Sequence, residues 1–227
     1  HIEAHSFPTR RSSDLRMLER YKTIKESGMN EIEIKGSRFI AHFQRVTDEE
    51  QALEFIQAIK KEHWKATHNC SAFLIGENDQ VQRAMDDGEP SGTAGVPMLE
   101  VLKKNELKDV AVVVTRYFGG TKLGAGGLVR AYSGAVSEGL KAIGIVECRL
   151  EDQLALTFDY AHVGKVEYYC QTQNIPIVDK VFLNNVQFTC SLPVQEVEAF
   201  QEAIIELLQN QVEFESLGEM YTEYPVG

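Results

Sequence analysis

The last third of this 227-residue chain has almost no basic residues. Residues 150–227 contain two, Lys165 and Lys180, against 13 acidic residues, whereas residues 1–149 contain 21 of each sign. The formal net charge of −11 therefore lies entirely in the C-terminal part. Binders of polyanions normally present a basic surface, so the C-terminal part is excluded as a general nucleic-acid binding region. The shift in charge predicts two domains, 17–149 and 150–227.

Cysteine is scarce, and long apolar runs are missing. The four cysteines form no CxxC pair and have no histidine at zinc-finger spacing: Cys70, Cys148, Cys170 and Cys190. We therefore expect isolated reduced thiols in a cytoplasmic protein. No apolar run approaches the roughly 20 residues that cross a bilayer, so the sequence predicts no membrane partner.

The first 16 residues, HIEAHSFPTRRSSDLR, lack both apolar periodicity and the apolar core of a signal peptide. They precede Met17 and contain three arginines. We expect a non-native or disordered leader, with Met17 as the true start. A short basic targeting arm is the alternative.

Apolar spacing predicts an α/β arrangement for residues 17–149. Strands are expected near residues 32–34, 39–43, 70–75 and 81–85, and the apolar run 110–114 predicts a strand buried on both faces. Helices are expected from Thr47 to about Trp64, just after Pro97, and over residues 128–140. Thr47 and Glu50 have the spacing of a capping box at the start of the first helix.

Residues 150–227 predict a β-α-β-β-α-β order, which is the ferredoxin-like split unit. Strands are expected at 154–158, 175–182, 186–190 and 212–221, and helices at 163–170 and 197–208. The four strands of this order can form a complete sheet with one another, without a strand from elsewhere in the chain. The order therefore supports a separate domain. The fold class is therefore α+β.

Nine of the 17 glycines lie between residues 88 and 134, and eight of these nine lie in the clusters 86–97 and 115–130. The second cluster follows a buried strand and opens a helix, and glycines there let a ligand approach the backbone amides. Residues 110–137 contain no Asp or Glu, although an even spread of 34 acids would place about four there. The cluster predicts an anion or nucleic-acid site with two hydroxyls from the first cluster: Arg116, Tyr117, Gly119, Gly120, Lys122, Gly124, Gly126, Gly127, Arg130, Ser91 and Thr93. The alternative is a tight strand-to-helix connection whose glycines only solve packing.

The first cluster offers three carboxylates, Asp86, Asp87 and Glu89, as weak candidates for a hydrated Mg²⁺. Capping of the following helix is the more ordinary role for them. Ser91 and Thr93 have no histidine within twenty residues to act as a base, so no catalytic residue is predicted. The pattern GxxxxGK[ST] of a phosphate-binding loop is absent, and no cofactor is expected.

The motifs DGEPSGTAGVP (residues 87–97) and VVTRYFGGTKLGAGGLVRAY (residues 113–132) resemble those of the IMPACT family and its bacterial YigZ-like branch. The resemblance covers about residues 17–224. It implies an N-terminal domain similar to the second domain of a small-subunit ribosomal protein and to domain IV of elongation factor G. It also implies a ferredoxin-like C-terminal domain similar to the last domain of that factor. Eukaryotic relatives act in translational control, but their RWD-type extension is not evident in this chain.

Three functions are consistent with these features. The favoured hypothesis is a translation-linked regulatory protein whose basic glycine loop contacts RNA or the ribosome. The second is a small-molecule enzyme that handles phosphate with the same loop and Mg²⁺. The third is an interaction scaffold whose acidic C-terminal domain binds a basic protein.

Overall fold

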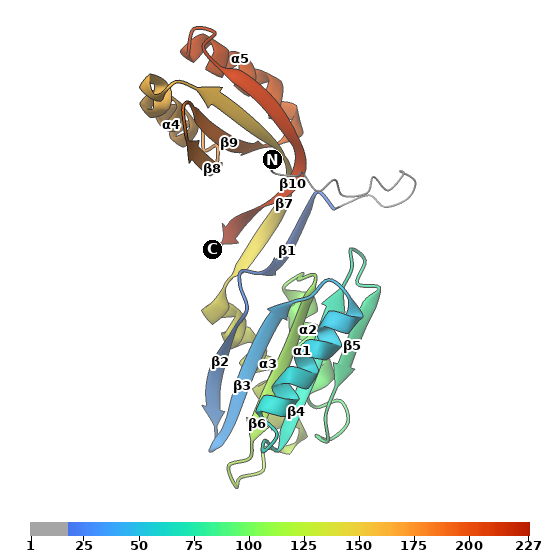
Figure 1. Cartoon of the computed structure of the whole chain (residues 1–227). Helices are drawn as coiled ribbons and strands as arrows, with labels where there is room; N and C mark the ends of the chain where they lie inside the picture. The colour runs from blue at the N-terminus through green and yellow to red at the C-terminus, as the bar shows by residue number, and fades with distance from the viewer. Residues whose placement is uncertain (1–17) are drawn as a thin grey trace.

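The structure, a computed structural model, describes residues 18–227 and has two lobes (Figure 1). The prediction for residues 1–16 lies outside these described residues. The N-terminal lobe is a five-stranded sheet with helices on both faces. The C-terminal lobe is a second sheet with two helices on one face. Within residues 18–227, no helix is long and apolar enough to cross a membrane.

The N-terminal sheet has the order β2-β3-β6-β4-β5, and every neighbouring pair is antiparallel. Its strands are β2 (Gly28–Ile34), β3 (Ser37–Arg45), β4 (His68–Ile75), β5 (Val81–Met85) and β6 (Val110–Tyr117). Strand β6 lies in the middle, and all five residues of its apolar run are fully buried. The prediction of a strand covered on both faces is confirmed.

Three helices cover this sheet: α1 (Glu49–Glu62), α2 (Gly95–Lys104) and α3 (Gly124–Ile143). Helix α1 packs on one face, where Ile56 meets Phe73 and Val113. Helices α2 and α3 pack on the other face, where Met98 and Tyr132 enter a larger core. Each face of the sheet is therefore sealed by an amphipathic helix.

The start of α1 differs from the prediction by one residue. Asp48, not Thr47, is the N-cap, and its carboxylate accepts a hydrogen bond of 2.8 Å from the amide of Gln51. The Gln51 side chain accepts in return from the amide of Thr47, at 3.0 Å. The arrangement is similar to a capping box, but Gln51 takes the place of the predicted Glu50 and bonds the amide before the N-cap instead of the N-cap amide.

The C-terminal lobe has the predicted β-α-β-β-α-β order: β7 (Ile145–Phe158), α4 (Val163–Thr172), β8 (Ile177–Phe182), β9 (Val186–Leu192), α5 (Val197–Leu207) and β10 (Glu213–Val226). Strand β7 pairs with both β9 and β10, which gives the order β10-β7-β9-β8. Two cysteines that were expected to be isolated, Cys170 and Cys190, lie in its core with their sulfurs 4.0 Å apart.

The chain passes between the lobes within strands rather than in a loop. The boundary predicted at residue 149 falls inside β7, and β1 (Arg20–Ile24) pairs with β7 although it precedes the N-terminal sheet. Arg45 of β3 donates hydrogen bonds to the carbonyls of Ile24 and Lys25 and pairs with Glu223 of β10. One arginine therefore fastens the N-terminal sheet to two strands of the other sheet.

Candidate functional site

Four loops meet at one end of the N-terminal sheet, which we call the loop end: residues 34–37, 62–68, 85–95 and 118–124. The strand register brings them together, because Arg38 and His68 pair with the last two residues of β6, Tyr117 and Arg116. Figure 1 shows the β2–β3 turn and the β6–α3 loop at the extremity of the N-terminal lobe that is remote from the C-terminal lobe. Both glycine clusters therefore belong to one surface.

Arg116 lies inside this end and not on it. Its guanidinium donates a hydrogen bond of 2.6 Å to the carboxylate of Glu89, and the two residues are only 5% and 7% exposed. The Tyr132 hydroxyl donates to the same oxygen at 2.8 Å, and His68 Nε2 lies 3.6 Å from it. Burial, followed by the neighbouring Cys70 and Glu89, raises the pKa of Tyr132, which keeps the hydroxyl protonated as a donor. This buried pair joins the two glycine clusters.

The three carboxylates considered as Mg²⁺ ligands each bond to different protein groups. Asp86 accepts from the amides of Gly92, Ala94 and Gly95 at 2.8–3.2 Å, and so caps α2. The carboxylate of Asp87 accepts from the amide of Asn69 at 2.7 Å, and Glu89 holds Arg116. Among residues 18–227, no group of three His, Cys, Asp or Glu side chains is arranged to hold a metal ion. Asp86 therefore has the alternative role considered from the sequence, which is capping of the following helix.

Replacing Asp86 by asparagine is expected to lower the free energy of unfolding at pH 7 by about 1 kcal/mol. Burial alone would raise the pKa of Asp86, but the amides of Gly92, Gly95 and Ala94 together hold it below its usual value. A lowered pKa means stability that is present above the ordinary carboxyl pKa and is lost as the pH falls through the folded value. Urea unfolding from pH 7 to pH 3 should therefore show the difference between wild type and variant shrinking. A difference that stays constant while exposed Glu100→Gln has no effect would contradict this.

Lys122 and Arg130 are the exposed cations of the second glycine cluster. Neither has a carboxylate within 4.0 Å anywhere in residues 18–227. Helix α3 begins beside them at Gly124, without a side-chain cap and without an acidic residue in its first turn. Free amides at a helix N-terminus attract anions, and the two cations add to this field.

The other predicted site residues are divided between surface and interior. Ser91 and the glycines at 119, 120, 124 and 126 are exposed, and Gly127 is half-buried. Thr93 is buried, and its hydroxyl donates to the carbonyl of Pro90 at 2.6 Å, so it is already used within the turn. Tyr117 is half-buried, and its hydroxyl is hydrogen-bonded to His63 Nδ1 at 2.8 Å. His63 and His68 are both part of the loop end.

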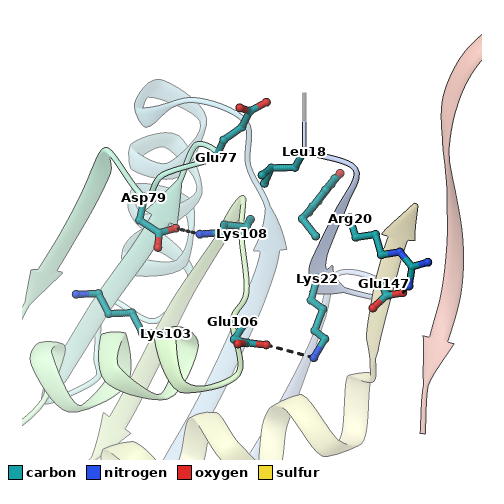
Figure 2. A pocket seen from close by; sticks show the side chains of 10 residues that line it. Leu18, Arg20, Lys22, Glu77, Asp79, Lys103, Glu106, Lys108 and Glu147 are labelled. Carbon is teal, nitrogen blue, oxygen red and sulfur yellow. Dashed lines mark hydrogen bonds and ion pairs between the residues drawn. The ribbon is translucent and has the colours of Figure 1, made fainter. Parts of the chain in front are cut away.

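A cavity of about 500 Å³ lies elsewhere, at the junction of the lobes (Figure 2). Its charged lining is balanced: Arg20, Lys22, Lys103 and Lys108 against Glu77, Asp79, Glu106 and Glu147. Figure 2 shows Lys108 directed at Asp79, 2.7 Å away, and Lys22 directed at Glu106, 3.5 Å away. Because its cations are largely neutralised by adjacent carboxylates, this cavity is a poor anion site compared with the loop end.

Residues 35–140 match the Impact N-terminal domain, and residues 156–211 match a domain of unknown function, DUF1949. The chain is 56% identical over 191 residues to IMPACT family member YvyE of Bacillus subtilis (strain 168), which covers 84% of this chain and 88% of that protein. The chain belongs to the IMPACT family. IMPACT family member YigZ of Escherichia coli (strain K12) is 31% identical over 189 residues, or 82% of this chain and 93% of that protein.

A solved structure described as the crystal structure of an hypothetical protein is similar across both lobes. It has a TM-score of 0.56 at 29% identity and covers 87% of this chain and 97% of its own. In this IMPACT family member, both glycine clusters lie within the Impact N-terminal domain. The family resemblance inferred from those two motifs is confirmed.

Proposed function

We propose that this IMPACT family member is a translation-linked regulatory protein whose loop end contacts RNA, free or on the ribosome. The proposal rests on the exposed charges of Lys122 and Arg130, which have no carboxylate partner within residues 18–227, beside the start of α3, which has no side-chain cap there. It lies within residues 110–137, which contain no acidic residue. Phosphate groups fit such a site because they accept several hydrogen bonds and carry negative charge.

The sequence predicted that Arg116 contacts the anion, but in this proposal Arg116 positions the loop instead. It is held behind the surface by Glu89, so it positions the β6–α3 loop rather than touching phosphate. The surface contacts come from Lys122, Arg130 and the exposed glycine amides, with Ser91 on the neighbouring loop.

The family supports the translational part of the proposal. The resemblance to the IMPACT family implies a link to translational control, the role of its eukaryotic relatives, and this chain matches the Impact N-terminal domain over residues 35–140. The expected likeness of the two lobes to elongation factor G domains belongs to the same proposal. The acidic C-terminal lobe, which has two basic residues against 13 acidic ones, would face away from RNA and toward a basic protein.

Replacing both Lys122 and Arg130 by alanine is expected to weaken RNA binding and to flatten its salt dependence. Each lost phosphate contact should reduce the slope of log K against log[salt] by about 0.7–0.9. Filter binding of an RNA over a salt series measures both quantities. The matched control is Lys141→Ala with Lys165→Ala, which removes the same charge from exposed positions away from the loop end. Equal affinities and slopes for the two double variants would contradict the assignment of the RNA-binding site to the loop end.

A further inference from the structure

Two large aromatic side chains are exposed to solvent at the loop end. Trp64, the only tryptophan in the sequence, is 72% exposed in the loop between α1 and β4. Phe118 is 48% exposed in the loop between β6 and α3. The sequence predicted a helix to about Trp64, but α1 ends at Glu62, and Trp64 lies in the loop that follows, with its ring outside the core.

The backbone under both rings is fixed. The amide of Thr67 donates to the carbonyl of Arg116 at 2.9 Å, and the amide of Phe118 donates to the Thr67 hydroxyl at 3.0 Å. On the other side of Trp64, the His63 amide donates to the carbonyl of Ile59 at 2.9 Å. The two loops are therefore bonded to each other, and a ligand that covered the rings would order little backbone on binding.

The cations of this surface outnumber its free carboxylates. Three acids are already paired: Glu31 with Arg38, Asp87 with Lys60, and Glu89 with Arg116. Within residues 18–227, five cations on or near the loop end have no carboxylate within 4.0 Å: Lys35, Lys61, Lys65, Lys122 and Arg130. Among residues 18–227, the acids there without a Lys or Arg partner are exposed Glu33 and Glu62 and half-buried Asp86, which accepts from backbone amides. Lys65 Nζ lies 5.1 Å from the centre of the Trp64 ring, so charge and aromatic face are adjacent.

We infer that the loop end binds single-stranded RNA by stacking bases on Trp64 and Phe118 while the unpaired cations contact phosphates. This inference rests on the function proposed above and names the kind of RNA. Exposed aromatic rings beside cations are the ordinary means of holding single strands without sequence preference. A duplex keeps its base faces covered, so it could use the cations but not the rings.

The single tryptophan makes the inference directly measurable, because all tryptophan fluorescence comes from Trp64. Titrating the full chain with a short oligouridylate should quench this fluorescence to a plateau, and added salt should weaken the effect. An RNA duplex of the same length should quench little and bind more weakly. Trp64→Ala should weaken oligouridylate binding about tenfold or more in a filter assay, and Trp64→Phe should restore most of it. Tyr168→Ala, at a 70% exposed aromatic position on α4, should bind like wild type.

Each outcome separates this inference from the function on which it rests. Binding that is weakened by the Lys122 and Arg130 double variant but not by Trp64→Ala, without quenching, would overturn the stacking and leave the proposed function standing. Equal affinity for duplex and single strand would also overturn the stacking. If Trp64→Ala lowers ribosome association while no free RNA binds, the surface docks a protein and the inference is wrong. Absence of binding to every RNA and to ribosomes would overturn both proposals.

Discussion

Replacing Glu89 by alanine is expected to lower the free energy of unfolding by about 3–5 kcal/mol. The change leaves the guanidinium of Arg116 buried without its counter-ion, and the Tyr132 hydroxyl loses its acceptor as well. An uncompensated buried charge is among the most destabilising defects that a single substitution can create. Urea unfolding followed by circular dichroism measures the loss.

Further variants show whether the loss of stability comes from breaking the ion pair between Glu89 and Arg116 or from any change at position 89. Glu89→Leu combined with Arg116→Met removes both charges, so the double variant should be more stable than Glu89→Leu alone. Glu33→Ala, at an exposed carboxylate, should change stability by no more than about 0.5 kcal/mol. A Glu89→Ala protein within about 1 kcal/mol of wild type would show that the pair does not hold the two glycine clusters together.

Gly119→Ala is expected to cost about 2–3 kcal/mol and to abolish RNA binding by the loop end. A Cβ atom at this position would lie 2.0 Å from the carbonyl carbon of Gly36 and 2.5 Å from the amide nitrogen of Ser37. These are backbone atoms, so the β2–β3 turn and the β6–α3 loop would have to separate. Separation would also strain the hydrogen bond that the Gly119 amide donates to the Ser37 hydroxyl at 3.1 Å.

Gly134→Ala is the matched control. It lies inside α3, and a Cβ atom there would meet nothing within 4 Å. Alanine is a better helix former than glycine, so this variant should gain up to about 1 kcal/mol. Hydrogen exchange should report faster opening of residues 34–37 and 118–123 in the Gly119→Ala protein alone. Changes of the same sign and size in both variants would mean that the close contact with Gly36 does not determine the loop geometry.

The sequence predicts this fold well where its periodicity is strong. The run at 110–114 identified the central strand, and the alternation at residues 154–158 with the helical stripes after it identified the C-terminal element order. Strand β1 was not predicted, because this five-residue strand forms by pairing with β7, more than 120 residues away. Pairing at that distance leaves no local signal.

The sequence placed the candidate site in two glycine clusters, and the structure shows which of its side chains are exposed and which are buried. From the sequence, Arg116 was predicted to be a cation of the site, because it adjoins a glycine-rich loop. Period-two alternation places it on the same face of β6 as Val112 and Val114, both in the core under α2 and α3. That alternation was the signal for its burial, although the partner Glu89, 27 residues away, was not readable from it. The helix predicted to end at about Trp64 ends two residues earlier, at Glu62, so Trp64 lies in a loop, and the exposure of its ring was not predicted.

Co-sedimentation of the full chain with ribosomes over a salt series tests the central claim most directly. Wild type and the Lys141→Ala, Lys165→Ala control should sediment together with ribosomes and dissociate steeply as salt rises. The Lys122→Ala, Arg130→Ala protein should dissociate at lower salt and with a shallower dependence. Sedimentation of the two double variants in equal amounts at every salt concentration would contradict the claim that the loop end is where this protein meets RNA.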